Sequence, residues 1–194
     1  MKEKLLLVGA GGLGRVALEH ASINYDCAFV DDADITEVDG VQVVGKITDI
    51  DKLFLEYRKL IVCIGNNSIR ESIYRAAKVI GYSFPNIVAS SAYISPHAKI
   101  GCGCIILNNV VIQNNAVLGD GAVISPGVEL HHDSTIGNNV LIYTNSVVRS
   151  LTHVGDRAWI GSTVSISTRA VVEADAIIND GSVVAAVTER SVKV

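Results

Sequence analysis

Aromatic residues and net charge are both scarce in this 194-residue chain. Only 5% of the residues are aromatic, and there is a single Trp and a single Met. The core must therefore be built mainly from Val, Ile, Leu and Ala, and the 49% hydrophobic content excludes a disordered chain. Sixteen basic and twenty acidic residues give a formal charge of −4, with a small acidic excess on each side of residue 90. A basic surface that binds nucleic acid is therefore not expected.

Cysteines and long hydrophobic runs are limited as well. Four cysteines do not make a disulfide scaffold in a chain of this length. Cys102 and Cys104 lie close together, but the sequence around them has no Cys or His cluster that would complete a zinc site. No run of 18 apolar residues predicts a membrane span, and the apolar run at residues 5–8 is too short for a signal peptide. We therefore expect a cytoplasmic protein with reduced thiols, no metal, and no membrane or nucleic-acid partner.

A six-residue repeat runs through the second half of the chain. Every sixth residue from Ile94 to Val184 is Ile, Leu or Val, and the residue two positions earlier is always small or Val. Because six is not a multiple of 3.6, an amphipathic helix is excluded. Three hexads would form one coil of a three-sided solenoid, with coils about 4.8 Å apart and the repeated residue inside a narrow prism. Glycines recur every eighteen residues, where we expect a corner with unusual backbone angles, at Gly101, Gly119, Gly137 and Gly155.

The first half of the chain predicts a small α/β domain with a parallel sheet. A strand-like run at residues 4–8 precedes the segment Gly9-Ala-Gly11-Gly12-Leu-Gly14 and a helix-compatible stretch to about residue 24. In this setting the glycines allow a tight turn and let phosphate oxygens approach backbone N–H groups at a helix N-terminus. A second run at residues 27–30 ends in Asp31 and Asp32, where a nucleoside contact is expected. The alternatives are a structural glycine turn and a solvated strand end.

The following segments complete this domain. We expect a helix over residues 48–57 with Thr48 as N-cap, then a strand over residues 60–64. A capping box from Ser68 to Glu71 is expected to open a helix that stops at Gly81. A dinucleotide fold needs two mononucleotide-binding halves, and about 85 residues supply only one. The glycine loop is therefore expected to bind one nucleotide diphosphate rather than NAD.

Taken together, these motifs resemble the sialic-acid and UDP-amino-sugar acetyltransferases among the hexapeptide-repeat acyltransferases, with the UDP-4-amino-sugar N-acetyltransferases as the nearest group. The resemblance covers nearly the whole chain. It implies a Rossmann-like nucleotide-sugar-binding domain at residues 1–87 and a left-handed parallel β-helix acyltransferase domain at residues 88–194. It also implies acetyl-CoA as donor, a UDP-amino-sugar as acceptor and a homotrimer. The residues that carry it are the glycine loop, Val30-Asp31-Asp32, Ile64-Gly65-Asn66-Asn67, Ile69-Arg70, Ile94-Ser95-Pro96 and a His-Asp-x-x-Ile-Gly segment.

The resemblance assigns roles to individual residues. It makes His132 the general base and Asp133 its acidic partner, with the adjacent His131 as the rival base. It places the backbone N–H that steadies the thioester oxyanion near Ser150. Arg157 and Arg169 are either contacts to the CoA phosphates or solvated surface charges. The nucleotide-sugar contacts that it implies are Gly9, Gly11, Gly12, Gly14, Asp31, Asp32, Gly65, Asn66 and Asn67.

The position of His132 in the repeat agrees with a base. Two residues past the inward-facing Leu130, it is expected at an outward-facing corner where a neighbouring solenoid could form a shared cleft. A neutral imidazole suits removal of a proton from an attacking amine, for a typical gain of about 10²–10⁴-fold. A carboxylate can fix the tautomer of that imidazole. No Ser or Cys stands beside His132 as an evident nucleophile, so no acyl-enzyme is required.

Two departures from the family pattern keep other functions open. Leu141 stands where many members have a second His, and the C-terminal Gly-x-Pro-Ala-Lys is absent from residues 183–194, so CoA would be held differently. A sugar O-acetyltransferase would use the same base and fold. A non-catalytic nucleotide-sugar-binding protein would explain both departures. A γ-type carbonic anhydrase would need three metal-binding histidines, two of them five residues apart, and the sequence has no such pair.

Overall fold

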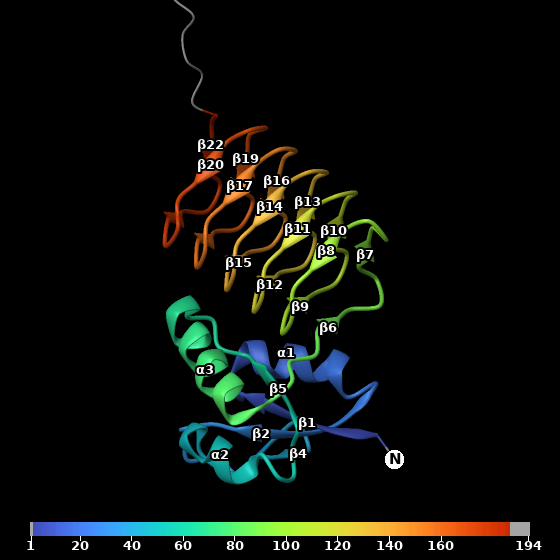
Figure 1. The fold of residues 1–194 in the computed structure, drawn as a ribbon, viewed down its shortest axis with the longest axis vertical. Helices are drawn as coiled ribbons and strands as arrows, with labels where there is room; N and C mark the ends of the chain where they lie inside the picture. The colour runs from blue at the N-terminus through green and yellow to red at the C-terminus, as the bar shows by residue number, and fades with distance from the viewer. Residues whose placement is uncertain (1, 187–194) are drawn as a thin grey trace, which may run out of the picture.

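The computed structural model describes residues 2–186, which form an α/β domain and a solenoid placed end to end (Figure 1). The α/β domain has a three-stranded parallel sheet in the order β2-β1-β5. Its strands are β1 (Glu3–Val8), β2 (Tyr25–Val30) and β5 (Lys59–Val62). A short antiparallel hairpin of β3 (Glu37–Val38) and β4 (Val41–Gln42) follows β2. In the described part of the chain, no helix has the length and apolarity that a bilayer crossing requires.

Helices flank the sheet on both faces. In Figure 1, α1 (Gly12–Ala21) lies between the sheet and the solenoid, and α2 (Ile50–Leu53) lies on the far side of the sheet. The predicted helix over residues 48–57 is wrong in length, because the chain forms a 3₁₀ turn, η1 (Ile47–Asp49), and then only one turn of α-helix. Thr48 is not its cap. The Asp49 carboxylate instead accepts the Lys46 N–H at 3.0 Å and closes this turn.

The third helix, α3 (Asn67–Ile80), borders β5 and reaches the solenoid. The Asn66 side chain caps it by accepting a hydrogen bond from the Ile69 N–H at 3.0 Å. The expected Ser68 capping box is therefore wrong, because the backbone is already helical at Asn67 and Ser68 lies inside the first turn. The predicted stop is confirmed, since Gly81 has a left-handed φ of 109°.

Residues 87–184 form the solenoid, a left-handed parallel β-helix of two-residue strands in three parallel sheets. The sheet orders are β22-β19-β16-β13-β10-β7, β20-β17-β14-β11-β8 and β21-β18-β15-β12-β9-β6. The strands are β6 (Ile87–Val88), β7 (Tyr93–Ile94), β8 (Lys99–Ile100), β9 (Ile105–Ile106), β10 (Val111–Ile112), β11 (Val117–Leu118), β12 (Val123–Ile124), β13 (Glu129–Leu130), β14 (Thr135–Ile136), β15 (Leu141–Ile142), β16 (Val147–Val148), β17 (His153–Val154), β18 (Trp159–Ile160), β19 (Ser165–Ile166), β20 (Val171–Val172), β21 (Ile177–Ile178) and β22 (Val183–Val184).

The register of the six-residue repeat is confirmed. The repeated apolar residue is the second residue of every strand from β7 to β22, and the interior of the prism is built from these side chains and the small residues two positions earlier. The solenoid also begins one strand before the repeat, because β6 pairs with β9. Since each coil bonds only to its neighbours, this part of the fold depends on local contacts.

Left-handed backbone angles occur at a different corner position from the one expected. They fall three residues before the repeated apolar residue, as at Asn109, where φ is 58°, and Asp133, where φ is 59°. Gly137 is not among the residues with positive φ. Instead, a Cβ at Gly137 would lie 2.7 Å from the backbone nitrogen of Asp156 and 2.9 Å from the carbonyl carbon of Gly155. The glycine column therefore serves the close approach of successive coils, and the expectation of unusual dihedrals there is wrong.

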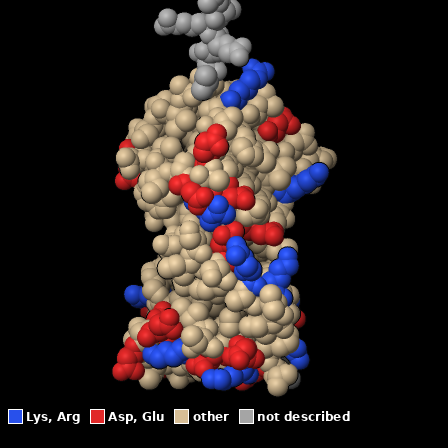
Figure 2. Space-filling view, turned by 60° about the vertical axis from the view of Figure 1, so that its left-hand side comes forward, with Lys and Arg blue, Asp and Glu red and all other residues tan. Residues whose placement is uncertain are grey.

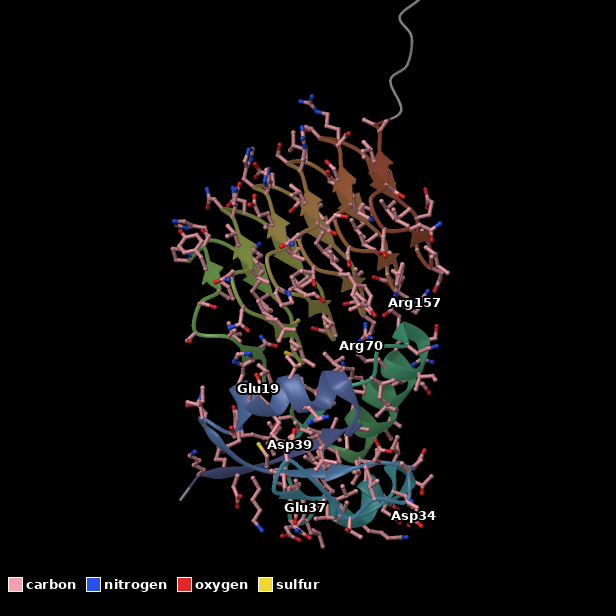
Figure 3. The ribbon with its side chains drawn as sticks, turned by 180° about the vertical axis from the view of Figure 1, so that it is seen from behind. Glu19, Asp34, Glu37, Asp39, Arg70 and Arg157 are labelled. Atoms are coloured by element: carbon pink, nitrogen blue, oxygen red, sulfur yellow. The ribbon has the colours of Figure 1, made fainter. Side chains whose placement is uncertain are left out.

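Buried polar contacts join α3 to the solenoid. The fully buried Arg70 donates to the carbonyl oxygens of Gly121 at 2.8 Å, Ile64 at 2.8 Å and Asn139 at 2.7 Å. Burial lowers the pKa of Arg70 to about 10, so the guanidinium stays charged at neutral pH. The hydroxyl of Tyr74 adds a further hydrogen bond to the solenoid. Figure 3 shows Arg70 at the junction of the two domains.

An apolar interface lies beside these polar contacts. The outward-facing first residues of β9, β12 and β15 are buried against the N-terminal domain. Leu141 on β15 is only 3% exposed. The position where a second histidine was considered is therefore part of the core between the domains. Arg157 and Arg75 both contact Glu71, at 3.3 and 3.5 Å. Figure 2 shows charges of both signs side by side around the middle of the molecule.

Candidate functional site

The loops that follow the three parallel strands meet at one edge of the sheet. The glycine loop follows β1, the acidic pair follows β2, and Gly65 with Asn66 follows β5, as the common direction of the strands requires. The Asp31 carboxylate accepts the Ala10 N–H at 2.7 Å and the Ala33 N–H at 2.8 Å. Asp31 therefore holds the glycine loop in place. Asp32 is exposed and accepts the Ile47 N–H at 3.1 Å.

The four glycines of the loop have different surroundings. Gly9 has a φ of 99°, and a Cβ at Gly14 would overlap the carbonyl oxygen of Gly9. These two glycines are needed by the turn itself. In contrast, a Cβ at Gly11 or Gly12 would have no atom within 4 Å. Gly11 is the N-cap of α1 without a side-chain cap, so no capping side chain satisfies the backbone N–H groups of the first turn, and an anion is a suitable partner for them.

Asn67 has a different environment from its neighbours Gly65 and Asn66. It is 8% exposed, and its Nδ2 donates to the carbonyl oxygens of Arg157 at 2.8 Å and Ala158 at 3.0 Å. Its Oδ1 accepts a hydrogen bond from Arg70 at 2.8 Å. The Asn67 side chain therefore joins the two domains, and Asn67 also lines a cavity together with Gly65 and Asn66.

The two arginines that were considered for CoA lie on different edges of the solenoid. Arg157 lies beside α3, where it forms a bidentate ion pair with Asp175 at 2.7 and 2.8 Å (Figure 3). This hydrogen bonding raises the pKa of Arg157 and lowers the pKa of Asp175. Arg169 is exposed and lies on the edge that carries His132, two coils further along. The structure therefore brings only Arg169 to the histidine edge.

His132 and Asp133 form an exposed pair at the corner between β13 and β14. Nδ1 of His132 lies 2.7 Å from Oδ2 of Asp133, and the side chains are 55% and 42% exposed. Because a carboxylate can only accept, we assign the proton to Nδ1, which leaves the lone pair of Nε2 available. The hydrogen bond from His132, followed by one from Asn115, lowers the pKa of Asp133 and keeps it ionised at neutral pH. This arrangement can accept a proton at Nε2.

His131 is less suited to that role. Its Nε2 lies 3.2 Å from the Glu129 carboxylate, and its side chain is 29% exposed. Ser150 occupies the same corner position as His132, one coil further along. Within residues 2–186, no backbone carbonyl accepts the Ser150 N–H. That donor is therefore available beside the base. No group of three or more potential metal ligands occurs in this described part of the chain.

The histidine edge and the glycine loop lie on different sides of the solenoid. The N-terminal domain packs on the sheet that contains β9, β12 and β15, whereas the corner with His132 joins the other two sheets. A single chain therefore presents the predicted site residues in two separate groups. One group contains the glycine loop, Asp31, Asp32, Gly65, Asn66 and Asn67. The other contains His132, Asp133, Ser150 and Arg169.

Comparisons with known proteins account for both domains. The PglD N-terminal domain model matches residues 4–77, and the bacterial transferase hexapeptide model matches residues 97–132 and 115–150. The acetyltransferase domain of PglB from Neisseria gonorrhoeae, in complex with acetyl coenzyme A, is 31% identical, with a TM-score of 0.71 over 94% of this chain and 96% of that chain.

A second solved structure is also similar over most of its length. It is a His-to-Asn variant of perosamine N-acetyltransferase from Caulobacter crescentus, in complex with CoA and GDP-perosamine. It is 28% identical, with a TM-score of 0.90 over 94% of this chain and 88% of that chain. With its PglD-type N-terminal domain and hexapeptide solenoid, this chain belongs to the hexapeptide-repeat sugar acetyltransferases and is an acyltransferase.

Proposed function

We propose that this protein transfers the acetyl group of acetyl-CoA to the amino group of a UDP-linked amino sugar. The observation that carries the proposal is the 2.7 Å hydrogen bond between His132 and Asp133, which leaves an open imidazole nitrogen on the solenoid edge. The similar proteins bind acetyl-CoA, or CoA with a nucleotide-linked amino sugar, and one is named an N-acetyltransferase. These names support an amine rather than a hydroxyl as acceptor. The choice of UDP as the nucleotide is the more specific part of the proposal.

In the proposed reaction, the free amine of the sugar attacks the carbonyl carbon of the thioester. His132 Nε2 accepts the proton that the nitrogen loses as the C–N bond forms, and Asp133 stabilises the resulting imidazolium. The Ser150 N–H donates to the oxygen that becomes negative. The C–S bond then breaks, and the CoA thiolate leaves and takes up a proton from the imidazolium. The products are the acetamido sugar and CoA, and His132 is neutral again.

We further propose that the reaction centre lies between chains of a homotrimer. In one chain, His132 is more than half exposed and lies on a different side of the solenoid from the glycine loop. A neighbouring chain would supply the missing wall and bring its own N-terminal domain to the base. In this arrangement, residues 1–87 bind the nucleotide sugar through Gly11 and Gly12. Residues 88–194 bind acetyl-CoA, with Arg169 beside the CoA phosphates.

The experiment is a panel of UDP- and GDP-linked 4-amino sugars, and of the matching sugars with a hydroxyl in place of the amine, with acetyl-CoA, in which release of the CoA thiol is followed. We expect thiol release with the amine-bearing sugars, a product heavier by one acetyl group, and a higher kcat/KM for the UDP-linked substrate. A higher kcat/KM for the GDP-linked substrate would show that the nucleotide is GDP and not UDP. Thiol release only with sugars that lack an amine would show that the reaction is O-acetylation and not N-acetylation. Binding without any release would support a non-catalytic protein.

A further inference from the structure

A cavity of about 510 Å³ lies where the loop after β5 meets the solenoid. Gly65 and Asn66 line it from the N-terminal domain, and Trp159, Ile177 and Asn179 line it from the solenoid. The cavity is continuous with the sheet edge where the candidate nucleotide loops meet, because Gly65 and Asn66 belong to both. It therefore lies where a ligand bound along that edge would contact the solenoid.

Trp159 lies at the boundary of the surface that the N-terminal domain covers. The outward-facing residues Ile105, Val123 and Leu141, on β9, β12 and β15, are at most 3% exposed. Trp159 is next in this column and is only partly buried, and Ile177 above it is 71% exposed. Trp159 is therefore the first side chain of the column that remains open beside the loop after β5.

Packing fixes the orientation of this indole. The ring centroids of Trp159 and Tyr143 lie 5.2 Å apart, with the planes tilted by 56°. Tyr143 is itself packed against the cluster between the domains. Trp159, which is packed against the same cluster, also lines the cavity. A large apolar surface held in one orientation is suited to bind a ligand without a large entropic cost.

The order of the strands predicts which part of a nucleotide sugar reaches this cavity. In the order β2-β1-β5, the acidic pair is expected at the nucleoside, the glycine loop at the diphosphate, and Gly65 with Asn66 at the group beyond the diphosphate. That group is the amino sugar. We propose that Trp159 is the platform on which the sugar ring of the nucleotide amino sugar lies, an inference that rests on the proposed function.

The chemistry of a pyranose fits this wall. One face of the sugar ring consists of C–H groups, which are attracted to the negative face of an aromatic ring. The polar edge of the sugar needs hydrogen-bond partners, and Asn66 and Asn179 line the same cavity. Asn66 Oδ1 is occupied by the Ile69 N–H, which leaves its Nδ2 for a ligand. Trp159 is in this view a specificity-determining residue, whereas His132 performs the proton transfer.

The chain contains a single Trp, so its fluorescence reports directly on this position. The protein is titrated with UDP and, separately, with a UDP-linked 4-amino sugar, under selective excitation of the indole. We expect the sugar nucleotide to change the emission of Trp159 and UDP to bind without a comparable change. Equal changes with both ligands would overturn the proposal, because the indole would then sense the nucleotide.

Kinetics of variants provide the second measurement. Trp159→Ala should raise the KM for the sugar nucleotide about 10-fold and change kcat by less than about threefold, with the UDP dissociation constant unchanged. Trp159→Phe keeps an aromatic ring and should therefore restore most of the affinity for the sugar nucleotide. Comparison of the two variants shows whether the Ala variant fails merely through misfolding. Tyr93→Ala, on an exposed aromatic of β7, is the control. If Trp159→Ala has an unchanged KM and still acetylates the sugar, the role of Trp159 is refuted and the proposed function stands. A wild-type protein that neither binds nor acetylates the sugar nucleotide refutes the proposed function as well.

Discussion

Nε of Arg70 and the carbonyl oxygen of Gly121 lie 2.8 Å apart, and this hydrogen bond ties helix α3 to a corner of the solenoid. The guanidinium is fully buried, its partners are buried or half-buried, and no carboxylate balances the charge among the hydrogen bonds that Arg70 makes. The charge is instead distributed over carbonyl and amide oxygens. Arg70 therefore determines how the N-terminal domain sits on the β-helix.

Arg70→Met should lower the free energy of unfolding by about 3 kcal/mol, because several buried oxygens lose their only charged donor. Urea unfolding followed by circular dichroism measures this change. Arg75→Met is the matched control on the same helix, because Arg75 is largely exposed and forms only a surface ion pair with Glu71. The control should change stability by less than about 0.5 kcal/mol. Equal effects of the two variants would show that the buried contacts contribute little.

Two glycines of the first loop should respond differently to the same substitution. Gly14→Ala should lower the melting temperature, because the new Cβ would overlap the carbonyl oxygen of Gly9. Gly11→Ala should leave the melting temperature unchanged, because no protein atom lies near its Cβ, yet weaken UDP binding about tenfold by blocking the phosphate. Calorimetric titration of both variants with UDP tests the distinction. Full UDP affinity in Gly11→Ala would show that the phosphates bind elsewhere.

The same loop should select the kind of nucleotide. UDP at saturating concentration should raise the melting temperature, and NAD should not, because the N-terminal domain supplies only one mononucleotide-binding half. A thermal-shift series over ligand concentration measures this effect. Stabilisation by NAD and not by UDP would contradict the sugar-nucleotide assignment.

His132→Ala should reduce kcat by about 10²–10⁴-fold and leave the affinity for the UDP-sugar nearly unchanged. Asp133→Asn should reduce kcat by about 10- to 100-fold, because the imidazolium loses its carboxylate. The hydrogen bond from His132 lowers the pKa of Asp133, so that carboxyl protonates only below its usual range. Any activity lost between pH 5 and pH 7 should therefore not come from protonation of Asp133. His131→Ala is the control, and it should retain most of the activity.

The composite site can be tested with mixed assemblies. Sedimentation should show a trimer. At sugar-nucleotide concentrations well below KM, His132→Ala and Gly11→Ala should each have little activity. When equal amounts of both variants are assembled together, about a quarter of the sites would combine an intact base from one chain with an intact glycine loop from its neighbour. Activity should recover to about that fraction. No recovery in verified mixed trimers, or full activity in a monomer, would place both groups of one site on the same chain.

The sequence predicted the solenoid well because its contacts are local. The position of a residue in the hexad decides whether it points inward, as Leu130 does, and eighteen residues bring the chain back to the same corner. The role of Gly137 was not predicted correctly, because the pattern alone does not separate a need for positive φ from a need for space. In the same way, Asn66 and Ser68 are both good caps, and the sequence does not indicate where helical angles begin.

The candidate site was predicted in part for a similar reason. The ends of neighbouring parallel strands must meet, so the glycine loop and the loop after β5 come together as expected. The contacts of Arg70 and Asn67 were not predicted, because their partners lie 51 and 90 residues away and are backbone carbonyls. Every residue has a backbone carbonyl, so the sequence does not indicate which of them accepts a hydrogen bond. Trp159 carried one signal in advance, as the single Trp of the chain, but only the docking of the domains places it beside the loop.

The position of the histidine edge relative to the N-terminal domain has a consequence for control of the enzyme. If each reaction centre needs two chains, mass action determines how much of the protein is competent at a given moment. Specific activity would rise with protein concentration until assembly saturates, and it would fall on dilution although every chain stays folded. The cell could then set the output of this protein through its abundance, without a dedicated inhibitor.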